Sequence, residues 1–369
     1  MQSKTHVEGP EEPQHLAVRL ESALQAWQIR RSLAKGYVRT VLPYTGYGST
    51  SWIRVLGRVV LSKSVRKDGP EALKTLREGI RGWRNFMSPP IRYATVTVEV
   101  AGETHRVSAD RGGVIDVRIP VRLELGANTV RLTSDDSATV ESTVFVISDD
   151  AEFGVVSDID DTVMVTALPR PLLAAWNTFV VDEHARNATP GMAVMMERVT
   201  QQHRGTPVLY LSTGAWNVAP TLTRFLSRNL YPAGPLLLTD WGPTLDRWFR
   251  SGLEHKRSSL ARLAREFPDI KWLLIGDDGQ HDEAIYAEFS RTHPENVTAV
   301  AIRQLSVGEA VLAGGRSSDT ADHSSDAPWI YAPDGAGISE KLEDLGFLAS
   351  DRDRVPEVPD AEDAADTSP

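Results

Sequence analysis

An open α/β domain with a parallel sheet, preceded by an all-β, sandwich-like domain, is the architecture that the sequence predicts. Two observations support it. In the first half of the chain, short runs of alternating apolar and polar residues are separated by segments of turn composition. After Asp150, continuous apolar runs alternate with helical patterns, which is typical of a parallel sheet covered on both faces.

The all-β domain is expected to cover residues 35–148. A β-like segment with several glycines runs from Tyr37 to Leu61, and four alternating strands follow at 93–100, 114–121, 128–134 and 141–147. The segments between them are rich in Gly, Asp and Ser, as turns are. Short strands at this spacing favour an antiparallel sandwich or barrel. Helical patterns are expected at 14–34, within an N-terminal segment 1–34, and at 68–85.

The α/β domain is expected to cover residues 150–305. Its five candidate strands are 153–157, 207–212, 234–238, 271–276 and 297–302, and the helical patterns between them are 190–204, 217–229, 254–266 and 281–293. A C-terminal extension, 306–369, is rich in Gly, Ser and Asp. We expect disorder at 313–326 and an acidic tail after Asp351, while 329–335 and the helix-like 338–348 could pack back on the domain.

Composition excludes some chemistries and leaves others open. The chain has no cysteine, which excludes disulfides, thiolate metal sites and a cysteine nucleophile. No apolar run approaches the roughly 20 residues of a membrane-spanning helix, and the polar N-terminus has no signal core, so a cytoplasmic location is the expectation. Residues 1–92 carry 16 Lys and Arg against 7 Asp and Glu. This basic segment could contact an anionic membrane surface, although a solvated helix face is the simpler interpretation.

The main chemical signal is VVSDIDDTVMVT at 155–166, where an apolar strand ends in Asp158 and Asp160, followed by Thr162. Ligands bind at the carboxyl ends of strands in open α/β domains. Two carboxylates this close repel each other unless a cation or a shared proton relieves the repulsion. A hard divalent ion is the natural partner. Taken alone, the motif could also be a helix cap or a calcium loop.

Three later segments complete a set of parts for phosphoryl transfer. Ser212, Thr213 and Gly214 follow the second strand, where a hydroxyl and backbone N–H groups can hold a phosphate oxygen. Lys256 lies at the start of a helical pattern and can offset the charge of a phosphate. Asp277 and Asp278 follow the fourth strand directly, with Asp282 beyond them. An attacking carboxylate, a cation and a second acid are what such a reaction needs.

In these segments the sequence resembles the haloacid dehalogenase superfamily of aspartate-nucleophile phosphatases, whose DxDxT signature matches Asp158, Asp160 and Thr162. The segments YLSTGAWN, GPLLLTDWG and LIGDDGQHDEAIY, together with Lys256, resemble the phosphatidate phosphatase catalytic-domain family within it. The resemblance covers about 150–305 and implies a Rossmann-like fold. It departs from the family at Gly214-Ala215, where a Ser-Pro pair is more usual, and at Asp278, where a Ser is.

The resemblance implies a role for each matching residue. Asp158 would be the nucleophile and a Mg²⁺ ligand, and Asp160 the general acid and base, with its backbone carbonyl on the metal. Ser212 would bind the phosphoryl group, Lys256 would stabilise it, and Asp277 would complete the metal shell. The remaining candidates are substrate-binding Thr162, Thr213 and Gly214, and the weaker metal candidates Asp278 and Asp282, either of which could instead cap a helix.

The resemblance also implies a substrate, phosphatidate, hydrolysed to diacylglycerol and phosphate. Residues 163–188 leave room only for a small cover over the site, as a membrane-presented substrate would need. Two other interpretations stay open: a phosphatase for a soluble or protein-borne ester, and a non-catalytic binding or regulatory module. No nucleic-acid partner is expected.

Four further residues near these motifs are interpreted as structural. His281 is interpreted as a helix-start residue, and Trp216, Trp241 and Trp248 as packing residues that could also line a lipid-facing mouth.

Overall fold

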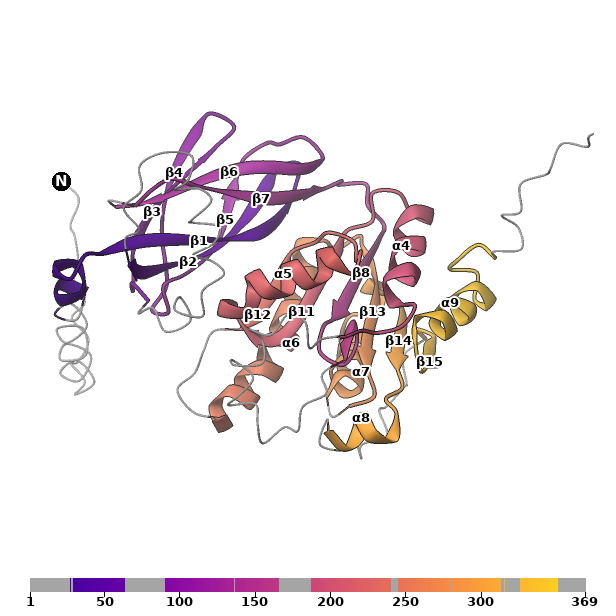
Figure 1. Ribbon diagram of the computed structural model, residues 1–369. Helices are drawn as coiled ribbons and strands as arrows, with labels where there is room; N and C mark the ends of the chain where they lie inside the picture. Colours follow the sequence, from indigo (N-terminus) through magenta and orange to yellow (C-terminus); the bar gives the residue numbers. More distant parts are fainter. Residues whose placement is uncertain are drawn as a thin grey trace, which may run out of the picture. The chain divides into compact units, whose positions relative to one another are not determined.

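The computed structural model describes residues 27, 29–63, 90–135, 137–165, 187–239, 245–279, 281–312, 315 and 326–350. The chain divides into two compact units, Met1–Ile147 and Ser148–Pro369 (Figure 1). Several expected features lie outside the described residues: the helix at 68–85, most of the helix at 14–34, most of 163–188 and 313–326, Trp241 and the acidic tail. Residues 29–34, at the end of the first expected helix, are helical.

The first unit is built on one sheet of seven strands in the order β4-β3-β6-β7-β1-β2-β5. The strands are β1 (Tyr37–Ser49), β2 (Trp52–Lys63), β3 (Thr95–Val100), β4 (Glu103–Ser108), β5 (Val114–Pro120), β6 (Gly126–Ser134) and β7 (Val140–Ile147). Neighbours are antiparallel except β1 and β7, which pair in parallel through residues 46–49. The sheet is therefore mixed.

The core of this unit follows from the alternation seen in the sequence. In β3, every second residue is buried, and the same period recurs in β7. The buried side chains come from all strands except β4 and form one cluster, which includes Val41, Val55, Val98 and Val144. Strand β4 has no such signal because its residues, ETHRVS, are mostly polar and exposed. An edge strand of this kind cannot be recognised by its apolar period.

The second unit is built on a six-stranded sheet in the order β12-β11-β8-β13-β14-β15, with every neighbouring pair parallel. The strands are β8 (Phe153–Asp158), β11 (Val208–Ala215), β12 (Leu236–Thr239), β13 (Lys271–Asp277), β14 (Val297–Arg303) and β15 (Trp329–Ala332). Nearly all residues of β8, β11 and β12 are buried, as expected for strands covered on both faces. A separate two-stranded sheet pairs β9 (Met164–Val165) antiparallel with β10 (Asn187–Ala188).

Helices connect and cover these strands (Figure 1). They are α4 (Met192–Gln202), α5 (Ala219–Arg228), α6 (Leu245–Glu266), α7 (Asp282–Thr292), α8 (Val307–Leu312) and α9 (Gly335–Asp344), with short 3-10 turns at Trp216–Val218 and Pro294–Asn296. Helix α6 contacts β11 and β12, α7 contacts β13, and α9 contacts α4 and β15. The strands and helices expected in 153–302 are all present, but α6 begins at Leu245 and not at 254, so Lys256 lies in the middle of the helix and the expectation that it lies at a helix start is wrong. The segment expected only to pack back supplies a sixth strand, β15, and helix α9.

The start of α9 packs backbone to backbone against the start of α4. The Gly335 N–H donates to the Pro190 carbonyl at 2.9 Å, and a Cβ on Gly335 would collide with Gly191 and with the Met192 nitrogen. We expect Gly335→Ala to lower the free energy of unfolding by about 1–3 kcal/mol, because no flexible side chain is there to give way. Chemical denaturation measures this.

The matched control is Gly308→Ala in α8, where a new Cβ would meet no atom within 4 Å. This variant should be as stable as the parent or slightly more so, since Ala favours a helix over Gly. Equal stability of the two variants would show that the contact between α4 and α9 is not as tight as the structure has it.

Candidate active site

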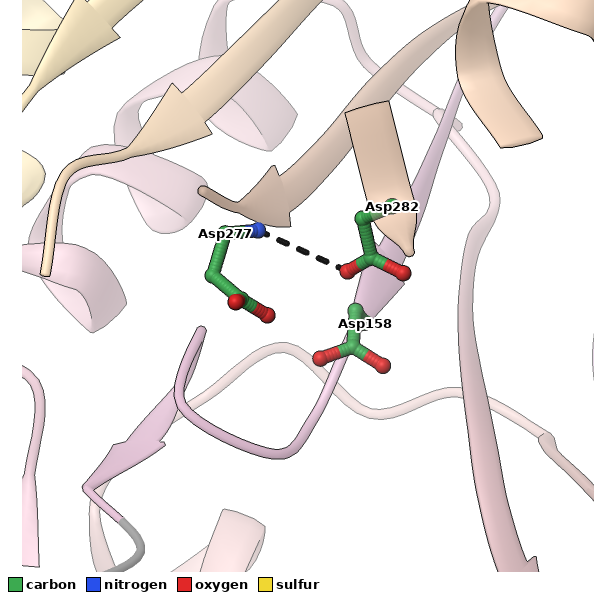
Figure 2. Close-up of side chains that lie close together, drawn as sticks. All are labelled: Asp158, Asp277 and Asp282. Carbon is green, nitrogen blue, oxygen red and sulfur yellow. Dashed lines mark hydrogen bonds between the residues drawn. The ribbon is translucent and has the colours of Figure 1, made fainter. Parts of the chain in front are cut away.

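Three carboxyl groups meet at the carboxyl ends of the second unit's strands. Asp158 is the last residue of β8, Asp277 is the last residue of β13, and Asp282 begins α7. Strands β8 and β13 are parallel neighbours with Ser157 opposite Ile275, so both chains deliver their acids to the same sheet edge. One oxygen of each carboxyl lies within 4.8 Å of the others. Figure 2 shows the three side chains close together.

Lys256 of α6 joins two of these acids. Its Nζ donates to Asp158 Oδ1 at 2.6 Å and to Asp282 Oδ1 at 2.5 Å. The lysine is 5% exposed, and the side chains of Asp158 and Asp282 are 3% and 4% exposed. These are therefore buried, charge-assisted bonds in a site with little solvent screening. The third acid, Asp277, is tied to the same group because its backbone N–H approaches Asp282 Oδ2 at 3.5 Å.

The electrostatics of the group are dominated by burial. Burial raises the pKa of Asp158 well above its usual range, and Asp282 and Asp160 raise it further, against the opposing effect of Lys256. The pKa of Asp277 is raised for the same reasons, by burial first and then by Asp282 and Asp158. Burial lowers the pKa of Lys256, but the two carboxylates outweigh it and raise the pKa overall. The site thus holds more negative charge than one lysine balances.

The turn after β8 positions Asp160. The N–H groups of Val163 and Met164 both donate to the Ile159 carbonyl at 3.1 Å, and Asp161 has a left-handed backbone with φ 60°. Within this turn, Asp160 Oδ2 accepts a 2.9 Å hydrogen bond from the Ser212 hydroxyl. Ser212 in turn accepts one from the Gly214 N–H at 2.9 Å. The carboxyl-terminal part of β11 is therefore linked to Asp160, in the turn after β8, through Ser212.

The other residues singled out in the sequence lie in different surroundings. Thr162 is fully buried, and Thr213 and Gly214 lie at the end of β11, with Gly214 buried. The Asp278 carboxylate accepts a 2.8 Å hydrogen bond from the Leu305 N–H, so one of its oxygens is used by the segment that follows β14. Of the flanking residues, His281 immediately precedes α7, and Trp216 is buried.

Asp282 is the residue that sequence reasoning undervalued. From the sequence it is expected to be a helix cap or a weak metal candidate. The structure places its carboxylate beside those of Asp158 and Asp277, where it accepts a hydrogen bond from Lys256. The signal was its position at the first residue of α7, five residues after Asp277, because the loop returns the chain to the sheet edge. The metal roles of Asp158, Asp160, Asp277 and Asp278 stay predictions.

The donor set fits a hard divalent cation. Three carboxylates with oxygens this close carry three negative charges when ionised, and Lys256 offsets one of them. The remaining charge and the all-oxygen donors are those that Mg²⁺ or a similar ion prefers. A cation at this position would also relieve the repulsion among the carboxylates, which adds to the effect of burial in raising the pKa of Asp158 and Asp277.

This charge imbalance predicts an effect of Asp277→Asn on stability. A carboxyl whose pKa is raised by folding contributes stability below its unfolded pKa and loses it as the pH rises through the folded pKa. In chelator at about pH 8, the Asn variant should therefore melt at a higher temperature than the parent, and the difference should shrink as the pH falls. Saturating Mg²⁺ should reverse the order, because only the parent gains full binding energy.

Thermal melts with chelator and with Mg²⁺, at several pH values, check this expectation. The control is Asp344→Asn at the exposed end of α9, which should melt with the parent under all conditions. An Asp277→Asn variant that is less stable than the parent in chelator would mean that burial and the neighbouring carboxylates do not raise the pKa of Asp277 in the folded protein.

The fold and site together define a parallel-sheet α/β domain with a lysine-bridged carboxylate group at its strand ends. Comparison with known proteins shows which family this domain is similar to. Residues 153–304 match the family model described as the catalytic domain of the phosphatidate phosphatase APP1. The matched segment runs from the start of β8 to the residue after β14 and contains all the acids of the site.

Two curated relatives match the same share of the chain. An uncharacterised protein of Schizosaccharomyces pombe is 31% identical over 160 residues, and the phosphatidate phosphatase APP1 of Saccharomyces cerevisiae is 23% identical over 151 residues. Each alignment covers 41% of this chain and 25% of the relative. The chain thus matches about a quarter of the length of these relatives.

Solved structures resemble the chain only weakly. A carbohydrate acetylesterase from Xanthomonas citri aligns over 83% of this chain and 74% of its own, with 12% identity and a TM-score of 0.29. A β-glucuronidase from Parabacteroides merdae aligns over 73% of this chain and 34% of its own, with 12% identity and a TM-score of 0.22. Scores this low establish no common fold.

Proposed function

We propose that this protein is a Mg²⁺-dependent phosphatase that hydrolyses a phosphomonoester through an aspartyl-phosphate on Asp158, with a catalytic domain of the haloacid dehalogenase type over residues 150–305. The observation that carries the proposal is the buried Lys256, bonded to Asp158 and Asp282 beside Asp277, at the strand ends of a domain similar to a phosphatase family. A lysine held between carboxylates suits a reaction that brings another anion into the same site.

In the first step, a carboxylate oxygen of Asp158 forms a bond to phosphorus as the ester P–O bond breaks. Asp160 gives its proton to the departing alcohol oxygen. In the second step, Asp160 takes a proton from water, the water oxygen attacks the same phosphorus, and the bond to Asp158 breaks. Inorganic phosphate leaves, and Asp158 is restored. Lys256, which donates a hydrogen bond to Asp158 in the structure, would offset charge that gathers on the phosphoryl oxygens.

The hydrogen bond between Ser212 and Asp160 supports this assignment of roles. The Ser212 hydroxyl donates to Asp160 Oδ2, and this contact orients the carboxyl that has to exchange protons with substrate and water. Binding of a phosphoryl oxygen by Ser212 would then use a rearranged hydroxyl, while the backbone N–H groups after β11 provide further donors. Thr162, Thr213 and Gly214 are proposed to line the same position.

Asp158 and Asp277 would hold the metal ion through their carboxylates, with Asp282 beside them and with the Asp160 carbonyl and Asp278 as the further candidates. When bound, Mg²⁺ would supply electrostatic stabilisation of the charge on the transferred phosphoryl group. The all-oxygen donor set is the feature of this chain that supports it.

Phosphatidate is the substrate we propose, with diacylglycerol as the second product. The support is the name of the matching family and of the yeast relative. The test is phosphate release by the purified protein from dispersed phosphatidate and from a panel of soluble monoesters, each with Mg²⁺ and with chelator. Release from phosphatidate that stops with chelator supports the proposal. Equal or faster release from soluble esters favours the alternative substrate class, and no release from any ester favours a binding or regulatory module.

Contact with a membrane is a separate proposal. The basic residues of 1–92, many of them outside the described part of the chain, could attract anionic headgroups to an enzyme whose substrate lies in a bilayer. No helix that the structure describes combines the length and apolar character needed to cross a membrane. We expect binding to liposomes containing anionic lipid, and this binding should weaken as salt is raised. Co-sedimentation that is absent, or indifferent to salt, would reject this contact.

A further inference from the structure

Arg303, at the end of β14, bonds to three separate segments of the second unit. Its Nη1 donates to the Asp161 carbonyl at 2.7 Å, its Nη2 to Glu309 Oε1 of α8 at 2.6 Å, and its Nε to the Pro333 carbonyl at 3.2 Å. The residue is 4% exposed. Every nitrogen of the guanidinium is therefore used, and one of the acceptors lies in the turn between Asp160 and Thr162.

The main chain of the same residue holds the second acid-bearing loop. The Arg303 carbonyl accepts the Asp278 N–H at 2.9 Å, and Arg303 lies opposite Asp277 in the pairing of β13 with β14. Two residues further on, the Leu305 N–H donates to the Asp278 carboxylate at 2.8 Å. The chain at 303–305 is thus bonded to the loop after β13 by backbone and side chain, next to Asp277.

We propose that Arg303 is a positioning residue for the candidate active site. Through its guanidinium it holds the turn that follows Asp158, and through its backbone it holds the loop that carries Asp277. The Asp161 carbonyl is available to it because Asp161 adopts the left-handed conformation, which a non-glycine residue keeps only where its surroundings support it. Arg303 therefore sets the separation of the two acid loops without touching the reacting atoms.

The chemistry of arginine explains the choice of residue. Its planar guanidinium presents donors in a fixed fork, so one side chain can join acceptors from three directions. Lysine keeps the charge near Glu309, but its three N–H donors all lie on one nitrogen. It could not hold the Asp161 carbonyl, Glu309 and the Pro333 carbonyl at once. Arg303→Lys thus removes the geometry and retains the charge.

The experiment compares Arg303→Lys with a matched control, Arg198→Lys. Arg198 of α4 is also largely buried, with its side chain 12% exposed, and it donates to Glu343 Oε1 at 2.7 Å and to the Ala349 carbonyl at 2.9 Å. None of these partners is in the acid loops. Three readouts are taken: Mg²⁺ affinity by titration calorimetry, hydrogen exchange of the peptide over 155–165 without metal, and kcat and KM for phosphate release.

For Arg303→Lys we expect Mg²⁺ affinity and kcat to fall by about 10- to 100-fold, as when a residue supporting a ligand is lost. KM should change little, and exchange should rise in 155–165 more than elsewhere. Both variants should lower the melting temperature by similar amounts. For Arg198→Lys, however, Mg²⁺ affinity, kcat and exchange in 155–165 should be the same as in the parent. Values for Arg303→Lys within about twofold of the parent, without faster exchange in 155–165, would overturn the proposal.

A second variant covers the case in which Arg303→Lys does not fold. In Arg303→Gln/Glu309→Gln both side chains are neutral, so no buried charge is left without a partner. The glutamine side chain is shorter than that of arginine and cannot reach the Asp161 carbonyl. The same losses are expected, and parent-like values overturn the proposal. The kinetic and the Mg²⁺-affinity readouts both rest on the proposed Mg²⁺-dependent phosphatase function. If the parent protein bound no Mg²⁺ and released no phosphate, the hydrogen-exchange comparison would still decide the role of Arg303.

Discussion

Asp158→Asn is expected to lower phosphate release by about 10⁴-fold or more while leaving the fold intact, because an amide cannot form the bond to phosphorus that the proposed mechanism requires. The substitution keeps the shape of the side chain at the end of β8. It also keeps an oxygen that can accept the hydrogen bond from Lys256. The loss should therefore appear in kcat, with circular dichroism and the melting behaviour showing a folded protein.

The control is Asp269→Asn, an exposed acid in the loop before β13, which should keep the activity of the parent. Rapid acid quenching of the parent during turnover should trap phosphate on the protein, and the Asn variant should trap none. Unchanged release from Asp158→Asn would remove Asp158 as the nucleophile and with it the mechanism proposed here.

Lys256→Met is expected to have the largest effect on stability. The lysine is bonded to Asp158 and Asp282, and all three groups are buried. Removal of one partner from a buried ion pair costs about 3–5 kcal/mol, because the other charge is left unpaired in a medium that solvates it poorly. For a unit of this size, the melting temperature should fall by about 10 °C in chelator. Phosphate release should be lost as well.

Mg²⁺ and low pH should each restore part of the stability of Lys256→Met. A cation at the site replaces some of the missing positive charge, and protonation removes the negative charges, since burial raises the pKa of Asp158. The control is Lys271→Met at the exposed start of β13, which should melt with the parent. If Lys256→Met were as stable as Lys271→Met at neutral pH in chelator, the three groups could not form the buried network described.

Much of the second unit could be predicted from the sequence because its signals are local. Each strand that the sequence predicts there is a continuous apolar run, and the last residues of β8 and β13 are acids that a buried strand could not hold elsewhere. Strand β15 was harder to predict, because four residues with partly exposed Trp329 and Tyr331 give a weak pattern. In the first unit, β4 was missed for the same reason.

The relations among the acids could not be read from spacing. Asp277 and Asp278 are adjacent, yet the Asp277 carboxyl lies with Asp158 and Asp282, while Asp278 accepts a bond from Leu305. Adjacent residues at a strand end point to different sides, so spacing alone does not decide which of them enters the site. The importance of Asp282 depends on how the chain returns to the sheet edge at the start of α7.

By itself, the sequence determined the order of strands and helices in the α/β unit, the edge of the sheet that carries the acids, and the resemblance to a phosphatase family. These follow from periods and motifs within short segments. Only the tertiary structure decided that Lys256 lies between Asp158 and Asp282, and that Arg303 joins the two acid loops. Such contacts link residues up to 142 positions apart, and parallel strands are joined by long crossover connections, so a pattern within one short segment cannot reveal them.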